Sequence, residues 1–511
     1  MIKIKSILWM MVTALAGGFA IVSCSSSDSS PVPIPPRDNT PVDYTIMFYS
    51  AGGENLDCET ENDLLKAAKA LQASDKQVRF IVQYKYSTQA GLDKQKEEQN
   101  YVPCGVAGGL YRFELLPSHI NANGVLEYFN ENMLYGSQQQ NSQIYRSDSI
   151  TSFINYCQRV APAKNYILLF SDHGSGYAVW ADYPKTRAIV SDKFHDDKSI
   201  SICDIRDGIK NSNMRHVKMI NFDACLMNNI EVITEVMNET DYVMASSHIS
   251  NGGNYTELVN SLRGADNDAI FEKNMSSYLN STIQNMYNSM TEGDNNAKFV
   301  PENTPKRCDW LLTNTAKFRA TVPTAVKAFT DKLISEYNAG HFADDDLQKA
   351  ANNCYQPAVG YSLYDIGQYV HWLAKANGNL NDVAAALKAA MENAQVCHYY
   401  TNKVLEDLSS MEYQKLSYTV NLGAKVGGLV LLRADIPNSA GKISCNESNG
   451  YYYYYTPGES TCELDTEEPR DANRAWDNSY RTTAFDKTTG WSKWLETNTH
   501  FPTKNPPFMC P

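Results

Sequence analysis

The chain has 511 residues, of which 43% are hydrophobic and 20% are charged. This is the composition of a globular protein, and the length allows roughly two or three domains or one elaborated domain. The formal net charge of −13 at pH 7 argues against nucleic acid as a partner, because a nucleic-acid-binding surface carries an excess of basic residues. The chain has no C-x-x-C and no H-E-x-x-H sequence, so a zinc site has no support.

The N-terminus has the pattern of an export signal. Lys3 and Lys5 precede sixteen uncharged residues, ILWMMVTALAGGFAIV. The sequence IVSC, which ends at Cys24, resembles a bacterial lipobox, and this resemblance implies cleavage before Cys24, diacylation of that cysteine and a lipid anchor. The alternative is an ordinary secretory signal that ends near a cysteine. We expect residues 1–23 to be a lipoprotein signal peptide and the protein to lie in the cell envelope, at the outer membrane, facing either the periplasm or the exterior.

Residues 24–42 predict a disordered tether. The sequence SSSDSSPVPIPPRDNTP contains too few apolar side chains to form a core, and its prolines favour an extended geometry. The rest of the chain has no run of about 18 apolar residues, the length that a membrane-spanning helix needs. Contact with a membrane is therefore expected through the lipid alone.

Residues 43–300 alternate between predicted strands and predicted helices. Continuous apolar runs such as YILLF are typical of strands that are buried on both faces of a sheet. The predicted strands are residues 44–53, 77–86, 165–171, 217–223 and 241–247, and the predicted helices are residues 61–74, 147–160, 200–210 and 228–237. This alternation predicts an α/β fold with a mostly parallel sheet flanked by helices.

Two parts of the chain depart from this alternation. Residues 88–146 are polar and poorly periodic, and we interpret them as an insertion with a short hairpin around GGLYRFEL. From about residue 315 the pattern becomes helical, in the stretches 315–337, 362–376 and 380–394, and residues 427–434 predict one more core strand. We expect residues 301–511 to form a C-terminal region of helices with at least one strand.

Two of the predicted strands end in chemically reactive residues. The strand at 165–171 leads to His173 and Gly174, and the strand at 217–223 leads to Cys225. Ligands of α/β sheets bind at the carboxyl ends of the strands, so these residues would face each other if the two strands are neighbours. An imidazole can take the proton of a thiol and activate it as a nucleophile, and the backbone N–H groups of Gly174 and Cys225 would then form an oxyanion hole. Each residue taken alone is more often a structural core side chain.

The cysteine count is compatible with a free nucleophile. Of the 12 cysteines, Cys24 belongs to the lipobox and eleven remain. Because eleven is odd, an exported protein would keep at least one thiol outside a complete set of disulfides, and Cys225 is the natural candidate. The other ten either pair or stay reduced, and the sequence does not determine their connectivity.

The segments SDHGSG (171–176) and FDACLMNNIEV (222–232) resemble the two signature blocks of the clostripain family of cysteine peptidases. YTIMFYSAGGENLD (44–57) resembles the family's first strand and the turn after it, and two later segments, at 361–370 and 427–433, resemble the family more loosely. The resemblance implies a caspase-like fold, shared with caspases, legumains and gingipains, for the catalytic region at 43–300. It also implies that His173 is the catalytic base and Cys225 the nucleophile.

The resemblance implies a substrate preference as well. Asp223 matches the family position that lines the S1 site, where a carboxylate pairs with Arg or Lys at P1; the alternative is a strand-end carboxylate that caps the next helix. Asn55 is a second S1 candidate. The chain departs from the family at Asn254, where members often carry a further acidic residue, and at Tyr177, where they usually carry Trp. The first departure favours, as an alternative, a peptidase with a non-basic P1 preference.

Some family members mature by self-cleavage after a basic residue between the catalytic His and Cys. The candidates here are Lys185, Arg187 and Lys193, although an exposed charged loop without cleavage explains this segment equally well. By resemblance, calcium is the one cofactor to consider, but no recognised calcium-binding loop is present.

The expected protein is thus a monomeric, lipid-anchored cysteine endopeptidase that acts on proteins or peptides. The alternative from another class is a surface lipoprotein that binds peptide or glycan on the same scaffold without turnover.

Overall fold

The computed structural model describes most of the chain from residue 40 onward. The described residues are 40–73, 75–127, 142–177, 189–195, 198–250, 252–288, 307–343, 345–357, 363–422, 442–446, 451–455 and 483–497. The predicted signal peptide, Cys24, residues 24–39 of the tether, Lys185, Arg187 and the predicted strand at 427–434 lie outside them. Among the described helices, none combines the length and the apolar composition that crossing a membrane requires.

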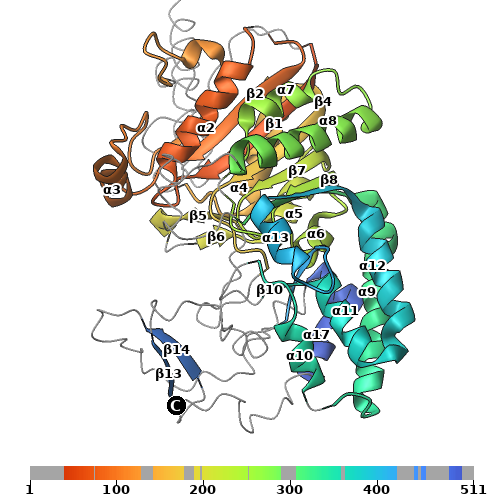
Figure 1. Ribbon diagram of the computed structural model, residues 1–511. Coiled ribbons are helices and arrows are strands. Elements are labelled where there is room, and N and C mark those ends of the chain that lie inside the picture. Colours follow the sequence, from red (N-terminus) through yellow and green to blue (C-terminus); the bar gives the residue numbers. More distant parts are fainter. Residues whose placement is uncertain are drawn as a thin grey trace, which may run out of the picture. The chain divides into compact units, whose positions relative to one another are not determined.

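An eight-stranded sheet forms the core of the fold, with the strand order β11-β9-β8-β7-β4-β1-β2-β3 (Figure 1). Its strands are β1 (Val42–Ala51), β2 (Val78–Lys85), β3 (Leu110–Glu114), β4 (Ala163–Ser171), β7 (Val217–Asp223), β8 (Thr240–Ala245), β9 (Asp309–Asn314) and β11 (Gln395–Tyr400). The five neighbouring strands from β2 to β8 run parallel, and β3, β9 and β11 extend the two edges in antiparallel orientation. The expected α/β class with a mostly parallel sheet is confirmed.

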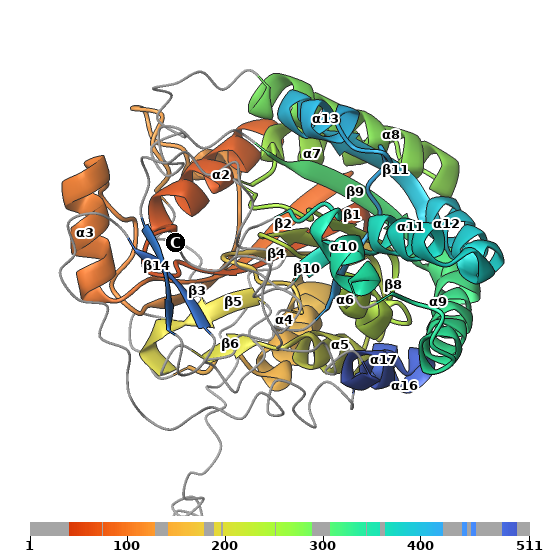
Figure 2. The ribbon, with the colours of Figure 1, turned by 60° about the horizontal axis from the view of Figure 1, so that its bottom comes forward.

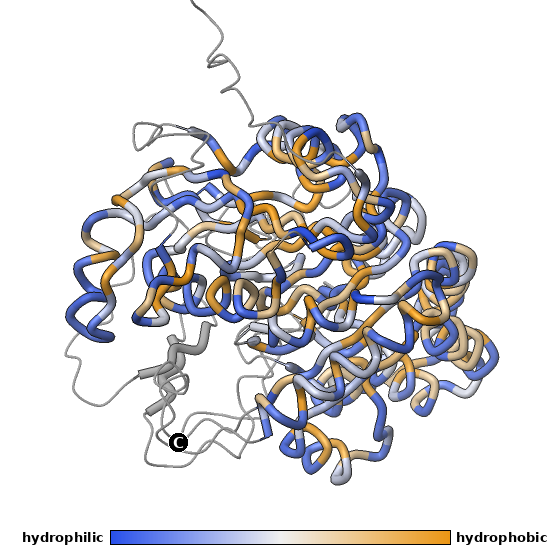
Figure 3. Tube along the Cα trace, turned by 90° about the horizontal axis from the view of Figure 1, so that it is seen from above, coloured by the Kyte–Doolittle hydropathy of each residue, from blue (hydrophilic) through white to orange (hydrophobic). Residues whose placement is uncertain are grey.

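The inner strands are apolar along almost their whole length. Every residue of β1 except Asp43 is buried, and so are the five consecutive residues Tyr166 to Phe170 of β4. In Figure 3 hydrophobic segments run through the interior of the trace, and hydrophilic segments are frequent at its periphery. Burial on both faces is the physical reason for the continuous apolar runs in the sequence.

Helices cover both faces of the sheet (Figure 2). On one face α2 (Asp57–Ala70), α7 (Tyr255–Leu262) and α8 (Asp268–Ser281) pack on a core that includes Phe48, Phe80 and Leu169. On the other face lie α4 (Ser147–Val160), α5 (Ile202–Lys210), α6 (Ile230–Val236) and α9 (Thr315–Asn338). There the Tyr49 ring of β1 contacts Phe153 of α4 with a centroid distance of 5.6 Å. The helices and strands predicted between residues 44 and 247 are therefore confirmed, with ends that differ by a few residues.

The segment that we interpreted as an insertion is structured over much of its length. It begins with α3 (Gln89–Gln99), and GGLYRFEL forms β3, which pairs with β2 and places Tyr111 opposite Tyr84. The expectation of a local hairpin is wrong, because β3 joins the main sheet. Helix α3 buries only Gly91, Leu92 and Gln95, so its sequence lacks the apolar periodicity that would have indicated a helix.

The sheet also gains two strands from the C-terminal half of the chain that the sequence did not predict. Strands β9 and β11 flank α9 and α12 (Asn381–Ala394) in the chain and pair with each other. The remaining elements are η1 (Pro117–His119), β5 (Ile189–Asp192), η2 (Lys193–His195), β6 (Lys198–Ile200), η3 (Thr282–Tyr287), α10 (Asp346–Asn352), β10 (Leu363–Asp365), α11 (Ile366–Ala376), η5 (Gly378–Leu380), α13 (Asn402–Ser409), β12 (Thr419–Asn421), β13 (Lys442–Asn446), β14 (Tyr451–Tyr455), α16 (Ala484–Thr489) and α17 (Trp491–Thr497).

Candidate active site

The two strands that carry the reactive residues are neighbours. Strands β4 and β7 pair in parallel, and Ser171 at the end of β4 lies opposite Asp223 at the end of β7. His173 and Cys225 each follow two residues beyond these ends, at the same edge of the sheet. The structure therefore brings together the two sequence blocks that suggested a nucleophile and its base.

Gly174 packs directly on the backbone of Cys225. A β-carbon at Gly174 would lie 2.3 Å from the carbonyl oxygen of Cys225 and 3.0 Å from its nitrogen. The first distance is too short for any side chain, and the obstacle is backbone, which cannot move aside cheaply. The glycine is thus required for the close approach of the two strand ends.

The His173 imidazole is oriented by the turn that follows β1. The Nε2 atom lies 2.8 Å from Oδ1 of Asn55, and the ring Cδ2 is close to Gly53, where a β-carbon would lie 3.0 Å from it. Because an amide oxygen is an acceptor, this contact places the ring proton on Nε2 and leaves Nδ1 to accept a proton. The imidazole remains exposed, yet partial desolvation, followed by the charge of Lys193, lowers the pKa of His173.

Asp172 holds the backbone next to this histidine. Its Oδ1 accepts the N–H of His173 at 2.6 Å and its Oδ2 accepts the N–H of Ser191 at 2.8 Å. Burial raises the pKa of Asp172 to about 7. The carboxylate therefore joins the end of β4 to β5, and sequence reasoning did not single it out.

The Cys225 thiol contacts the backbone of Ser250. The Ser250 N–H lies 3.4 Å from the sulfur, and the thiol donates to the Ser250 carbonyl at 3.7 Å. Burial raises the pKa of Cys225, and the N–H groups of Ser250 and Gly174 act in the opposite direction because they stabilise a thiolate. Among the described residues, no hydrogen bond joins the thiol to the His173 ring, so the two groups each have another partner in this state.

Asp223 lies beneath this edge and is almost fully buried, with 5% of its surface exposed. Its Oδ2 accepts the Tyr255 hydroxyl at 2.6 Å and the Gly253 N–H at 3.4 Å, whereas Oδ1 has no partner among the described residues. Burial, followed by the charge of Asp63, raises the pKa of Asp223 to about 7. The alternative role as a helix cap is wrong, because the Asn229 side chain caps α6.

Comparison with known proteins decides the family. The model of the clostripain family matches residues 49–497. The chain belongs to the clostripain family of cysteine peptidases. No curated protein matches it.

Among solved structures, the fold is similar to that of other cysteine peptidases. A secreted C11 cysteine protease from Bacteroides thetaiotaomicron, in complex with an irreversible peptide inhibitor, is 16% identical with a TM-score of 0.50, over 88% of this chain and 99% of that chain. An inactive zymogen C11 protease from Parabacteroides distasonis is 15% identical with a TM-score of 0.49, over 89% and 99%. At 16% identity, the likeness to the first of these structures supports the fold and nothing finer.

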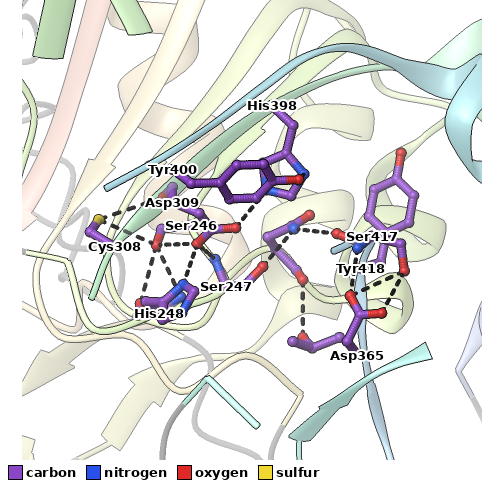
Figure 4. Close-up of polar contacts among 12 residues, drawn as sticks. Ser246, Ser247, His248, Cys308, Asp309, Asp365, His398, Tyr400, Ser417 and Tyr418 are labelled. Atoms are coloured by element: carbon purple, nitrogen blue, oxygen red, sulfur yellow. Dashed lines mark hydrogen bonds and ion pairs between the residues drawn. The ribbon is translucent and has the colours of Figure 1, made fainter. Parts of the chain in front are cut away.

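In this peptidase, the loop that contacts the thiol is supported by a buried aspartate on β9 (Figure 4). Asp309 accepts the Ser247 N–H and contacts Nδ1 of His248, each at 2.7 Å, through Oδ1. Its Oδ2 lies 2.7 Å from Nε2 of His398 on β11. The next residues of this loop reach Ser250, so Asp309 connects the far edge of the sheet to the surroundings of Cys225.

The electrostatics of this cluster favour an ionised carboxylate. Burial alone would raise the pKa of Asp309, but the contacts with His248 and His398 outweigh it and hold the pKa well below its usual range. Tyr355 adds a hydroxyl 2.8 Å from Nε2 of His248. Sequence reasoning missed these residues, since a lone Asp in DWLLTN carries no local signal.

Other predicted site residues have clear positions. Asn55 lies against His173, as described above, and its expected role in the S1 site stays a prediction. The Asn254 side chain accepts the Glu257 N–H and caps α7. Tyr177 is buried, and its carbonyl accepts from the Asn421 amide at 3.0 Å.

Of the three expected self-cleavage residues, Lys193 is the one that the structure describes. It is half-buried and follows Asp192, which forms an ion pair with Lys85 at 2.8 Å, with side chains 0% and 1% exposed. His195 contacts the same carboxylate at 2.8 Å. The Lys193–Phe194 bond therefore adjoins a buried charged cluster.

The described cysteines are free thiols, namely Cys58, Cys104, Cys157, Cys203, Cys225, Cys308, Cys354 and Cys397. Within the described part of the chain, no group of three or more His, Cys, Asp or Glu side chains is arranged to hold a metal ion, so these residues do not identify a calcium site.

Proposed function

We propose that this clostripain-family member is a cysteine endopeptidase that cleaves after Arg or Lys, with Cys225 as the nucleophile and His173 as the base. The observation that carries the proposal is the pairing of β4 with β7, which places both residues beyond neighbouring strand ends while Gly174 packs on the Cys225 backbone. A dyad of this kind is the arrangement that thiol activation requires.

Catalysis would begin with proton transfer from the Cys225 thiol to Nδ1 of His173. This step needs the thiol to leave the Ser250 carbonyl and approach Nδ1, while Nε2 keeps its contact with Asn55. The thiolate would then attack the scissile carbonyl, and the N–H groups of Gly174 and Cys225 would stabilise the oxyanion, a contact worth roughly 10²–10³ in rate for each donor. His173 returns the proton to the leaving amine, and water hydrolyses the acyl-enzyme.

Asp223 supports the basic P1 preference. Its buried carboxylate is two residues from the nucleophile, and Oδ1 has no partner among the described residues. A P1 guanidinium or ammonium would supply the missing donor and a compensating charge, which is the strong type of hydrogen bond.

We further infer that self-cleavage, if it accompanies maturation, follows Lys185 or Arg187 in preference to Lys193. Cleavage at the Lys193–Phe194 bond would require the buried pair of Asp192 and Lys85 to be exposed. Separating a buried ion pair typically costs about 3–5 kcal/mol.

The decisive experiment is hydrolysis of fluorogenic peptides that differ only at P1, with Arg, Lys or a neutral residue, by the protein and by Cys225→Ala and His173→Ala. We expect cleavage of the Arg and Lys peptides and none by either variant, and parallel assays with and without calcium measure whether the activity depends on this ion. Cleavage of the neutral peptide alone would support the dyad and overturn the assignment of Asp223. A folded protein that cleaves none of the peptides would favour a non-catalytic binding lipoprotein.

A further inference from the structure

The carboxylate of Asp63, on helix α2, lies near the carboxylate of Asp223. A β-carbon at Gly252 would lie 3.4 Å from Oδ2 of Asp63 and 3.5 Å and 3.6 Å from the two carboxylate oxygens of Asp223. Asp63 is on the helix that follows β1, and Asp223 ends β7, so residues far apart in the chain converge on one point beside Gly252.

This point lies next to the nucleophile. The Ser250 backbone contacts the Cys225 sulfur, and Gly252 is two positions further along the same loop. The loop is anchored there, because the Tyr287 hydroxyl donates to the Gly252 carbonyl at 2.8 Å and the Gly252 N–H donates to the Ser250 hydroxyl at 3.3 Å. A long P1 side chain that extends from the thiol toward Asp223 would therefore also meet Asp63.

The two carboxylates have capacity for one more cation. Asp223 has its unpartnered Oδ1 at this point, inside a residue that is 5% exposed. Asp63 uses Oδ1 for Lys66, whose Nζ is 2.8 Å away, and directs Oδ2 at Gly252. Two negative charges and one positive charge leave a net charge of about −1, which a single P1 cation would balance.

We propose that Asp63 is a specificity-determining residue of the S1 site, which binds the P1 cation together with Asp223, and that Lys66 limits the net charge of the site. The proposal rests on the proposed function, because it assumes that Cys225 attacks the carbonyl of the P1 residue and that the P1 side chain extends to Asp223. It adds a contact from α2 to a site that is otherwise built from the ends of β7 and β8.

The raised pKa values of Asp63 and Asp223 are consistent with a cation that both carboxylates bind. Burial raises the pKa of Asp63, and burial followed by the charge of Asp63 raises the pKa of Asp223 to about 7. A cation between them favours the ionised form of both, whereas a neutral P1 side chain leaves their repulsion in place.

The test measures charge recognition without turnover. Full-length Cys225→Ala protein is titrated at pH 8 by calorimetry with a peptide that has Arg at P1 and with the same peptide carrying citrulline, which is nearly isosteric and uncharged. The ratio of the two affinities reports recognition of the charge. We expect Asp63→Asn to lower this ratio about tenfold, the size of one charge-assisted hydrogen bond, and Asp63→Glu to restore part of it.

Lys66→Met provides an independent variant with the opposite expected sign, because it removes the competing cation and should raise the ratio several-fold. Lys69→Met, on the same helix, is a matched control that should leave the ratio unchanged. A ratio lowered by Asp223→Asn but unaffected by Asp63→Asn and Lys66→Met would overturn the role of Asp63 and keep the S1 assignment. A parent ratio near one would instead overturn the basic preference itself.

Discussion

The turn at Cys225 combines a reactive side chain with an unusual backbone. Leu226, directly after the nucleophile, has a φ of +65°, which a non-glycine residue adopts at a cost of roughly 1–3 kcal/mol. Its N–H donates to the His248 carbonyl at 3.0 Å, which compensates part of that cost. Strain of this kind is common where a side chain must be presented in one orientation, and here it directly follows the residue whose thiol contacts the Ser250 backbone.

Asn55 is expected to act as a positioning residue for His173. Asn55→Ala removes the acceptor at Nε2, so the ring loses its preferred tautomer and orientation, and kcat should fall about 10- to 100-fold with little change in KM. Asn55→Asp keeps an acceptor and adds a negative charge, which raises the pKa of His173. The acidic limb of the kcat/KM profile should therefore move to higher pH in Asn55→Asp and should not move in Asn55→Ala. A pH profile of kcat/KM for both variants checks this; equal losses with unchanged profiles would contradict it.

The pKa of Asp223 predicts a pH-dependent substrate preference. With a pKa of about 7, the carboxyl is mostly protonated at pH 6 and mostly ionised at pH 8. The preference for an Arg over a neutral P1 peptide, as a ratio of kcat/KM values, should then rise about tenfold between these pH values. Asp223→Asn should flatten the ratio, and an unchanged slope in that variant would show that another group titrates.

At the scale of elements, the loop after β8 depends on β9 and β11. Both strands supply side chains to the cluster of Asp309, His248 and His398 that supports residues 246–250 (Figure 4). These two strands therefore support the loop beside the thiol as well as extending the sheet. Because both strands pair in antiparallel orientation, they do not belong to the alternation of strands and helices from which the parallel strands were predicted.

Asp309→Asn should weaken both stability and catalysis. It leaves two buried histidines without their shared charged partner, and we expect a loss of about 3–5 kcal/mol in the free energy of unfolding, together with a lower kcat. Since the folded pKa of Asp309 is depressed, its contribution to stability is present above the unfolded value of about 4 and is lost as the pH falls below it. Denaturant unfolding at several pH values should show that the variant loses less stability on acidification than the parent protein does.

At the scale of the whole molecule, the proposed lipid anchor is the feature that depends on sequence alone. Cys24→Ser should move the protein from the membrane fraction to the soluble fraction of the envelope, without changing the hydrolysis of peptides in solution. Detergent phase partitioning, with metabolic labelling by a fatty acid, checks this. A protein that stays soluble and unlabelled before substitution would support the ordinary secretory signal instead.

The sequence by itself determined the class of the fold and predicted the reactive pair. Buried parallel strands impose continuous apolar runs, and β1, β2, β4, β7 and β8 were found from those runs. The blocks around His173 and Cys225 were recognisable because chemistry restricts which residues follow a strand end. Strands β9 and β11 and helix α3 were missed, because their sequences have neither an apolar run nor a helical period.

Only the tertiary structure decided which residues surround that pair. The side chain of Asn254, where the resemblance suggested a second acid, caps α7, while α2 brings Asp63 to Asp223. Likewise Asn55 contacts His173, and Asp309 supports the loop beside the thiol. These contacts join positions that are tens to hundreds of residues apart, and their partners are chosen by the packing of helices and strands. A pattern of neighbouring residues cannot predict contacts between positions so far apart in the sequence. It can predict a strand and the turn that ends it, because both are formed by consecutive residues.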